Sequence, residues 1–469
     1  MKAALGRRRH GSLSRILPLA WPVFIGQLAV LAYSTIDTLL VARYAALDLA
    51  ALAVGNAMYT SVFVGLMGVI LAVSPVAAQR FGAQDHEGVG DCLHQAAWLA
   101  LALTLVGELI LLFPDPLLAL ARPEPAVEAI VRRHLHFLGL ALPAALLFTA
   151  YRGFNTAVSR PKAVMALQVG GLALKLPLSA ALIHGLPALG LRPMGAPGGA
   201  LATALVVWSQ LLVGLWVLRH DPHYAPFGLQ RGGLHPPRPA LIGRLLRLGL
   251  PMGASILIEV TGFTFMALFI SRLGATSVAG HQLAANLVAM MFMLPMALGN
   301  ATGALVGQRI GARDFADARR LGWHGLEIAL AFALLMGGLV FLLRRQVLSL
   351  YTPDPLILAA ALPLLLWVWL FHVGDACQAI AASVLRAHHV ALAPMLVYAV
   401  AIWGLGLGGG YWLAFAPPAW LPGFCRGASG FWLAASLGLM MCSAGLVALM
   451  AWVHGHEAQE SGETASTLA

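Results

Sequence analysis

The sequence has 469 residues, of which 60% are hydrophobic and only 10% are charged, and its mean hydropathy is +0.82. Soluble domains carry about 25% charged residues, so this composition excludes a chain built mainly of water-exposed domains and favours one that lies in a membrane. The net charge of +10 does not indicate nucleic-acid binding, because the basic residues lie in short segments between apolar stretches, with no basic face interleaved with aromatic residues.

Apolar segments long enough to cross a bilayer as helices, about 20 residues each, follow one another along the chain. We count twelve of them, at residues 15–42, 49–75, 93–113, 129–152, 163–184, 198–218, 245–271, 279–306, 320–343, 357–384, 391–414 and 427–453. The first contains Asp37 and is too long for the apolar core of a signal peptide, so we interpret it as an uncleaved span. The sequence therefore predicts an all-α polytopic membrane protein in contact with the lipid bilayer.

The basic residues indicate the topology. Because the number of spans is even, both termini are expected on one side. Lys and Arg are about twice as frequent in the connections on that side, which predicts cytoplasmic termini by the positive-inside rule. We expect a multi-pass protein of a bacterial-type inner membrane, and nothing in the sequence requires more than a monomer.

A connection rich in Pro, Gly and His divides the chain into two halves. The expected parts are a cytoplasmic N-terminal segment (1–14), a first half of six spans (15–218), a cytoplasmic linker (219–243), a second half of six spans (244–453) and a polar tail (454–469). The composition of the tail, HGHEAQESGETASTLA, predicts disorder.

The two halves repeat one another. The segment QRFGAQD at 79–85 recurs as QRIGARD at 308–314, and the same offset pairs Pro22 with Pro251. Six spans separate equivalent positions, so the repeats share one orientation and are expected around an axis along the membrane normal, with a central cavity between them. This architecture is typical of an alternating-access transporter.

Glu259 lies inside the apolar stretch 251–272. A carboxylate at the centre of a membrane helix costs roughly 2.5–3.5 kcal/mol, so it is expected to face a polar cavity or a partner. Ser255 and Phe263 lie one turn away on the same helical face, and the small residues there would leave room for water or an ion. The alternative is a structural acid that bonds to backbone or hydroxyl groups.

Asp375 lies in the tenth span, where it shares a helical face with Phe371 and Gln378. Carboxylate and amide oxygens suit Na⁺, and two nearby carboxylates can equally share a proton. The sequence therefore predicts a possible Na⁺ site or a proton site at Glu259 and Asp375.

Lys175 is the only basic residue deep in a span, and an intramembrane charge is usually paired. We hypothesise an ion pair between Lys175 and Asp37 inside the first half, which would leave Asp37 less free to carry a proton. The alternative is that Lys175 extends to the membrane surface.

Two further groups of side chains have open roles. Gln282 and Asn286 place two amides on one face of the eighth span, either near the acids or in helix–helix hydrogen bonds. Aromatic and Met side chains could line a cavity for flat lipophilic cations, or simply face lipid. The members of this second group are Phe263, Phe371, Phe292 and Met293.

The sequence also resembles the multidrug and toxic compound extrusion (MATE) transporters, in particular their NorM-like branch. The resemblance covers about Arg15 to Trp452 and rests on IDTLLVARYAALDLAALAVG in the first span, GATSVAGHQLAANL in the eighth, the doubled QR-hydrophobic-GA(Q/R)D segment, and the acids of the seventh and tenth spans.

The resemblance implies export of small organic cations coupled to inward flow of H⁺ or Na⁺. It implies Glu259 and Asp375 as the ion-coupling residues of the second half, with Gln282 and Asn286 near them, and Asp37 as the carboxylate of the first half. The chain departs from the family pattern in two places. Phe371 stands where a Tyr is common, which removes a hydroxyl and favours H⁺, and Lys175 with Ser179 stands where Asn-x-x-x-Asn is common.

Other functions are less consistent with the sequence. A related flippase for lipid-linked saccharides would need a strongly basic cavity, and only Lys175 is both basic and deep. An enzyme would need a nucleophile, metal or cofactor motif, and the sequence contains no nucleotide-binding Gly-rich loop and no HExxH. We therefore expect a transporter that is not an enzyme and that has no cofactor apart from the coupling ion.

Overall fold

The computed structural model describes residues 2–121, 123–187, 190–230 and 233–467. In these ranges, twelve helical stretches are long and apolar enough to cross a membrane, and each overlaps one of the predicted spans. The prediction of an all-α polytopic membrane protein is confirmed.

The chain divides into two compact units. The N-terminal unit comprises Trp21–Gly253, and the C-terminal unit comprises the chain up to Ala20 together with the chain from Ala254. The divisions fall inside the first and seventh spanning helices, because the start of the first helix packs with the second half of the sequence and the start of the seventh packs with the first half.

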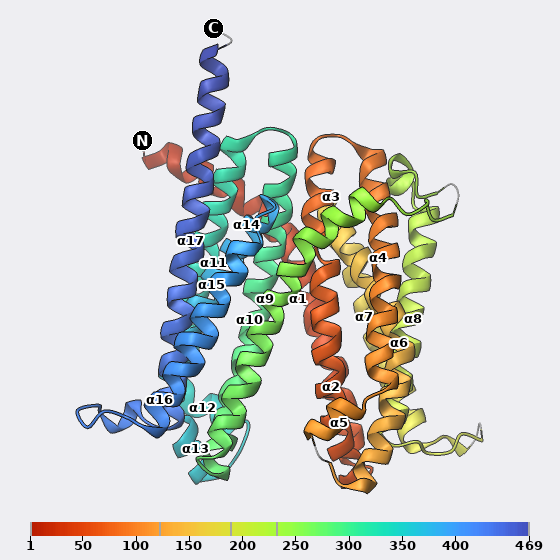
Figure 1. The fold of residues 1–469 in the computed structure, drawn as a ribbon, viewed down its shortest axis with the longest axis vertical. Helices are drawn as coiled ribbons and strands as arrows, with labels where there is room; N and C mark the ends of the chain where they lie inside the picture. The colour runs from red at the N-terminus through yellow and green to blue at the C-terminus, as the bar shows by residue number, and fades with distance from the viewer. Residues whose placement is uncertain (1, 122, 188–189, 231–232, 468–469) are drawn as a thin grey trace. The chain divides into compact units, whose positions relative to one another are not determined.

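The N-terminal unit is built around one helix. α6 packs against α2, α4 and α8, and 72% of its most apolar window is buried, so it is the central helix (Figure 1). The helices of this part of the chain are α1 (Lys2–Ala42), α2 (Ala46–Ile70), α3 (Val73–Gly82), α4 (His86–Leu112), α5 (Asp115–Ala121), α6 (Pro125–Ala157), α7 (Pro161–His184), α8 (Ala196–His220) and the short η2 (Pro222–Phe227).

The C-terminal unit has the same plan, with α14 packed against α10, α11 and α17 (Figure 1). Its central helix α14 carries Asp375, and 61% of its most apolar window is buried. The helices are α9 (Pro239–Ser271), α10 (Ala275–Gly311), α11 (Phe315–Leu342), α12 (Arg344–Ser349), α13 (Pro355–Ala361), α14 (Leu364–Ala387), α15 (Leu392–Tyr398), η3 (Ala399–Gly408), α16 (Gly409–Phe415), η4 (Gly423–Cys425) and α17 (Ala428–Thr467).

Two of these helices differ from the prediction. The tenth span begins only at Leu364, because the apolar run from 357 is interrupted around Pro363, where α13 ends and α14 starts. At the other end of the unit, α17 continues as helix to Thr467, where the polar composition predicted a disordered tail.

The repeated QR-x-GA-x-D segment is a turn between two helices in each unit. Asp85 is the N-cap of α4 and accepts a hydrogen bond from the N–H of Gly88 at 3.0 Å. Asp314 caps α11 in the same way, accepting from the N–H of Asp317 at 3.1 Å. The residue before each cap, Gln84 or Arg313, has a left-handed φ of 62° or 57°, which reverses the chain. The repetition therefore reflects a shared scaffold, since a capped N-terminus satisfies backbone donors that would otherwise lack partners.

Candidate functional site

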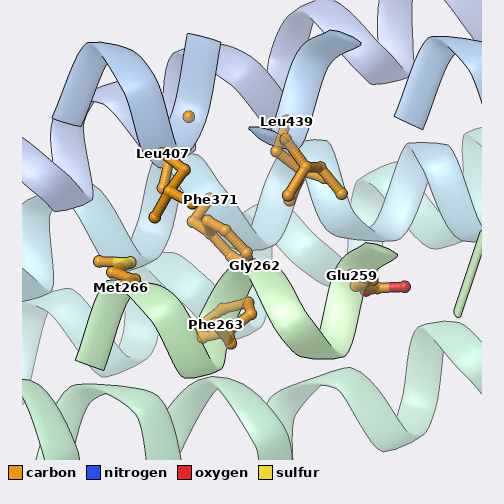
Figure 2. A pocket seen from close by; sticks show the side chains of 10 residues that line it. Glu259, Gly262, Phe263, Met266, Phe371, Leu407 and Leu439 are labelled. Atoms are coloured by element: carbon orange, nitrogen blue, oxygen red, sulfur yellow. The ribbon is translucent and has the colours of Figure 1, made fainter. Parts of the chain in front are cut away.

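Glu259 lies on α9 at the end of a small cavity within the C-terminal unit. The cavity has a volume of about 30 Å³, room for about two water molecules. Its wall is apolar apart from Glu259, and its lining comes from α9, α14, η3 and α17. Figure 2 shows the Glu259 carboxylate pointing away from Phe263 and Phe371, so the carboxylate and the aromatic wall face different surroundings.

Asp375 is only 2% exposed. Its Oδ1 accepts a hydrogen bond from Nε2 of Gln378 at 3.0 Å, and the Oε1 of Gln378 in turn accepts one from the hydroxyl of Tyr398. Phe371, one turn before Asp375 on α14, lines the same cavity as Glu259, so the two acids are close enough for the charge of Glu259 to act on Asp375. The structure therefore brings the two predicted acids and Gln378 near one another on α9 and α14, with Asp375 and Gln378 buried and Glu259 half-buried.

The sequence analysis missed Tyr398. It is the last residue of α15, is 2% exposed, and its hydroxyl donates to Gln378, which in turn donates to Asp375. The only signal in the sequence was a phenol within an otherwise apolar span. Its hydroxyl lies in the same cluster as the acids. The absence of a hydroxyl at Phe371 is therefore no longer an argument for H⁺ over Na⁺ as the coupling ion.

A wide helical turn follows Tyr398 directly. Residues Ala399–Gly408 form a π-helix, η3, a conformation that is rare and frequent at functional sites. Ile402, Gly406 and Leu407 of this segment line the cavity beside Glu259, and the indole N–H of Trp403 donates to the carbonyl of Ile258 at 3.1 Å. The irregular segment thus contacts α9 at the residue before the acid.

Two of the four aromatic and Met candidates meet at the cavity. The ring centroids of Phe263 and Phe371 are 5.4 Å apart, and that of Phe371 is 5.8 Å from the fully buried Trp432. Phe292 and Met293 are half-buried on α10 and are not among the lining residues. A pocket for a drug-sized ligand has about 300–1,000 Å³, so this cavity is too small to hold an organic cation in the conformation described.

Of the predicted supporting polar residues, some lie near the acids and others do not. Ser255 is 4% exposed and lies one turn before Glu259 on α9, as predicted. Gln282 and Asn286 are exposed on α10, and the structure does not bring them into the cluster of Asp375, Gln378 and Tyr398. Their i, i+4 spacing put the two amides on one helical face but could not say which way that face points.

A second intramembrane acid site lies in the N-terminal unit. The ammonium of Lys175 donates to Oδ2 of Asp37 at 2.7 Å, to Oγ1 of Thr203 at 2.6 Å and to the carbonyl of Gly199 at 3.0 Å. Ser179 donates to the other carboxylate oxygen at 2.8 Å. Lys175 has no exposed surface and Asp37 is 6% exposed. The predicted ion pair is confirmed, and the alternative of a lysine that reaches the membrane surface is wrong.

The two sites differ in what neutralises the carboxylate. At Asp37 the three ammonium N–H groups of Lys175 each have an oxygen partner, so this site is complete without a further cation. In the C-terminal unit, neither Glu259 nor Asp375 forms an ion pair with any basic side chain that the structure describes, although the charge of Arg386 acts on Glu259. Two carboxylates, an amide and a phenol offer oxygens that suit Na⁺ or a shared proton.

Comparison with known proteins gives consistent results. The sequence matches the MatE family over residues 22–181 and 251–412. It is 41% identical over 404 residues to a probable multidrug resistance protein NorM of Aromatoleum aromaticum, with 86% of this chain and 87% of that protein covered. It is 35% identical over 471 residues to the multidrug resistance protein PmpM of Pseudomonas aeruginosa, with 99% and 98% covered.

The fold is also similar to solved structures. The crystal structure of the eukaryotic MATE transporter AtDTX14 superimposes with a TM-score of 0.84 at 19% sequence identity, covering 97% of this chain and 99% of that chain. An outward-facing multidrug resistance MATE transporter gives a TM-score of 0.85 at 18% identity, covering 95% and 96%. At such low identity the likeness concerns the fold alone.

Proposed function

The chain belongs to the MatE family of multidrug efflux transporters, and on this premise we propose that it is a secondary antiporter that exports small lipophilic organic cations in exchange for H⁺ or Na⁺ by alternating access. The observation that carries the proposal is that the half-buried Glu259 on α9 and the buried Asp375 on α14 lie beside one cavity, which Glu259 and Phe371 line, and that neither acid has an ion-pair partner among the described side chains. Two neighbouring carboxylates disfavour the doubly ionised state, so the cluster gains free energy by taking up a proton or a cation.

Coupling follows from competition for this negative charge. When the site is open to the outside, the coupling ion binds and the organic cation leaves; after the switch, the ion is released inside and a new substrate binds. Each ligand favours the state in which it binds more tightly, which is the thermodynamic requirement for exchange. Tyr398 and Gln378 hold Asp375 in place for this exchange through their hydrogen-bond chain.

Asp37 has a different role in this proposal. Because Lys175 neutralises it within the same unit, Asp37 does not take up the coupling ion, and the exchange uses Glu259 and Asp375. The pair also argues against a saccharide flippase, because Lys175, the only buried Lys or Arg among the described residues, is paired with a carboxylate and cannot bind pyrophosphate.

The number of ions exchanged decides whether membrane potential contributes. A potential supplies about 2.3 kcal/mol per elementary charge per 100 mV. Exchange of one ion for one monovalent substrate moves no net charge, whereas two ions, one for each carboxylate, would add an electrical drive.

We place both termini in the cytoplasm of an inner-membrane protein, on the bias of Lys and Arg along the chain, and propose that the monomer is the transporting unit.

The test is efflux of ethidium from liposomes that contain the purified protein, with a pH gradient or a Na⁺ gradient imposed separately. We expect one of the two gradients to drive efflux by the wild type and neither to drive it in Glu259→Gln. Glu87→Gln, the same change at an exposed position at the start of α4, is the matched control and should transport normally.

Each outcome assigns a mechanism. Efflux driven by pH alone identifies a proton antiporter, and efflux driven by Na⁺ alone identifies a Na⁺ site at the same residues. Drive by neither gradient, or a Glu259→Gln protein that still couples normally, would overturn the proposal and leave the flippase as the function to test next.

A further inference from the structure

The chain between α16 and α17 forms a lateral projection of the C-terminal unit. Residues 416–427, with the sequence APPAWLPGFCRG, leave the end of α16 and extend sideways from the helix ends before α17 begins (Figure 1). This segment has no acidic residue, and Arg426 is its only basic one. It lies between two consecutive membrane spans, Leu392–Phe415 and Ala428–His456, so it is at the level where the chain leaves the hydrocarbon.

The single charge of the projection is used internally. The guanidinium of Arg426 donates to the carbonyl of Leu421 at 2.6 and 2.9 Å, to that of Ala419 at 3.0 Å and to that of Pro418 at 3.3 Å. These bonds satisfy backbone acceptors that Pro-rich sequence leaves without regular partners. Cys425 and Leu421 are buried, with 8% and 9% of their surfaces exposed. The loop is therefore held together by hydrogen bonds from its only charged side chain.

Its outer surface is aromatic. Trp420 is 80% exposed and Phe424 is 60% exposed, values that would be costly in water for the two largest apolar side chains of the segment. The same apolar surface continues onto the adjoining span, where Trp412 is 52% and Tyr411 is 43% exposed on α16. The aromatic side chains thus run without a charged interruption from a membrane-spanning helix onto the loop.

We propose that residues 416–427 form a membrane-interface anchor, with Trp420 and Phe424 inserted at the boundary between headgroups and acyl chains. Trp and Tyr are enriched at this depth because an indole or phenol is apolar in its body and polar at one edge. Lipid is the occupant that the structure favours, because the loop continues a lipid-facing surface at the ends of two spans and offers no free charge to a protein partner. α17 crosses the membrane once between the loop and the C-terminus, so the anchor lies on the face opposite the C-terminus. This inference is independent of the transported substrate and of the coupling ion.

The anchor has a mechanical consequence. The loop joins α16 to α17, and α16 follows the π-helical η3 that lines the cavity beside Glu259. An anchored loop fixes the depth of these helix ends in the bilayer. A change of conformation at η3 would then move other parts of the C-terminal unit and leave the loop in place.

The experiment is fluorine NMR of the full-length protein, labelled with fluorotryptophan and placed in nanodiscs that hold one copy each. Trp420→Phe identifies the resonance of Trp420 among those of the 12 tryptophans, and Trp216→Phe identifies that of Trp216, which is 61% exposed on spanning helix α8 and serves as a lipid-facing control. One sample contains phosphatidylcholine with a doxyl radical near the top of its acyl chain, and another contains a soluble gadolinium chelate.

We expect the lipid radical to broaden the Trp420 resonance until it is lost, as it does for Trp216, and the soluble chelate to broaden it less. Stronger broadening by the chelate would place Trp420 in water and overturn the proposal. Protection from both probes would mean that protein covers the side chain, and would also overturn it. Protection that appears only in discs loaded with two copies would reassign the surface to a contact between copies.

Discussion

Asp37 and Asp375 are both aspartates buried in spanning helices, with 6% and 2% of their surfaces exposed, yet their surroundings differ. Asp37 bonds to the ammonium of Lys175 at 2.7 Å and to the hydroxyl of Ser179 at 2.8 Å. Asp375 bonds to an uncharged amide, and the strongest neighbouring charge is that of another carboxylate, Glu259. The ammonium of Lys175 is part of the protein and neutralises Asp37 permanently, whereas Glu259 and Asp375 need a mobile cation or a proton for neutralisation. The comparison therefore separates a structural charge from a coupling charge.

The repeat relation sharpens this contrast. The two units share the capped turns at Asp85 and Asp314, but the offset that aligns those turns pairs Asp37 with Met266 and Glu259 with Val30. The scaffold is repeated while the charges are not. The position of each acid is therefore not set by the shared helix plan, which is consistent with different tasks for the two sites.

The largest expected effect is on transport. Asp375→Asn should abolish gradient-driven ethidium efflux. The cluster then has a single carboxylate, so the repulsion between two carboxylates no longer favours uptake of the coupling ion. The double variant Asp37→Asn with Lys175→Met should keep most of the wild-type rate, because it removes a neutral pair. Initial rates in proteoliposomes measure both, and equal loss in the two variants would contradict the division of roles.

The next effect is on stability. Removing one member of a buried ion pair costs about 3–5 kcal/mol, because it leaves an uncompensated charge, while replacing both members is often close to neutral. Lys175→Met should therefore lower expression and the melting temperature in detergent strongly, and Asp37→Asn in the same chain should restore both.

Lys162→Met is the matched control for that experiment. Lys162 is exposed in the first turn of the same helix, α7, so the same substitution there should leave the melting temperature nearly unchanged. Additive effects of the two single substitutions, with no rescue in the double variant, would argue against a coupled pair.

A smaller effect is expected at Tyr398. Tyr398→Phe removes the hydroxyl that donates to Gln378 and leaves a buried acceptor without its partner, a loss of about 1–3 kcal/mol. Because Gln378 orients Asp375, we expect a slower efflux rate with the same coupling ion. Tyr411→Phe, at an exposed position on α16, is the control, and an equal reduction in both variants would remove Tyr398 from the coupling cluster.

The smallest effects concern the shared turns. Asp85→Ala and Asp314→Ala each remove an N-cap and should each lower stability by about 1 kcal/mol. Asp85→Asn should cost less, because Asn keeps the cap and loses only the surface ion pair with Arg80, which has an N–O distance of 3.8 Å. Thermal unfolding of the four proteins tests this order, and a much larger cost at one turn would show that the two units do not use the segment in the same way.

Much of the architecture was predictable from the sequence alone. Spans are set by the length of apolar stretches, because a helix must keep its backbone hydrogen-bonded across the hydrocarbon. The family was predictable because its motifs are local, and Glu259, Asp375, Asp37 and Lys175 stood out because charge in a membrane is costly wherever it lies. Even the ion pair between Lys175 and Asp37 could be inferred, since there was only one deep cation to pair.

The contacts within the sites depended on the tertiary structure. Helical spacing predicts which residues share a face but not which helix that face meets, so Gln282 and Asn286 were expected near the acids and are exposed, while Tyr398 was overlooked and joins them. Phe292 and Met293 are of the same residue types as the cavity wall but do not line the cavity, again because the sequence does not say which way a helical face points. The sequence by itself determined the spans, the repeat and the cost of each buried charge, because these are properties of single segments. Only the packing of α9, α14, α15 and α17 decided which groups share one polar cluster, because those contacts join helices far apart in the chain.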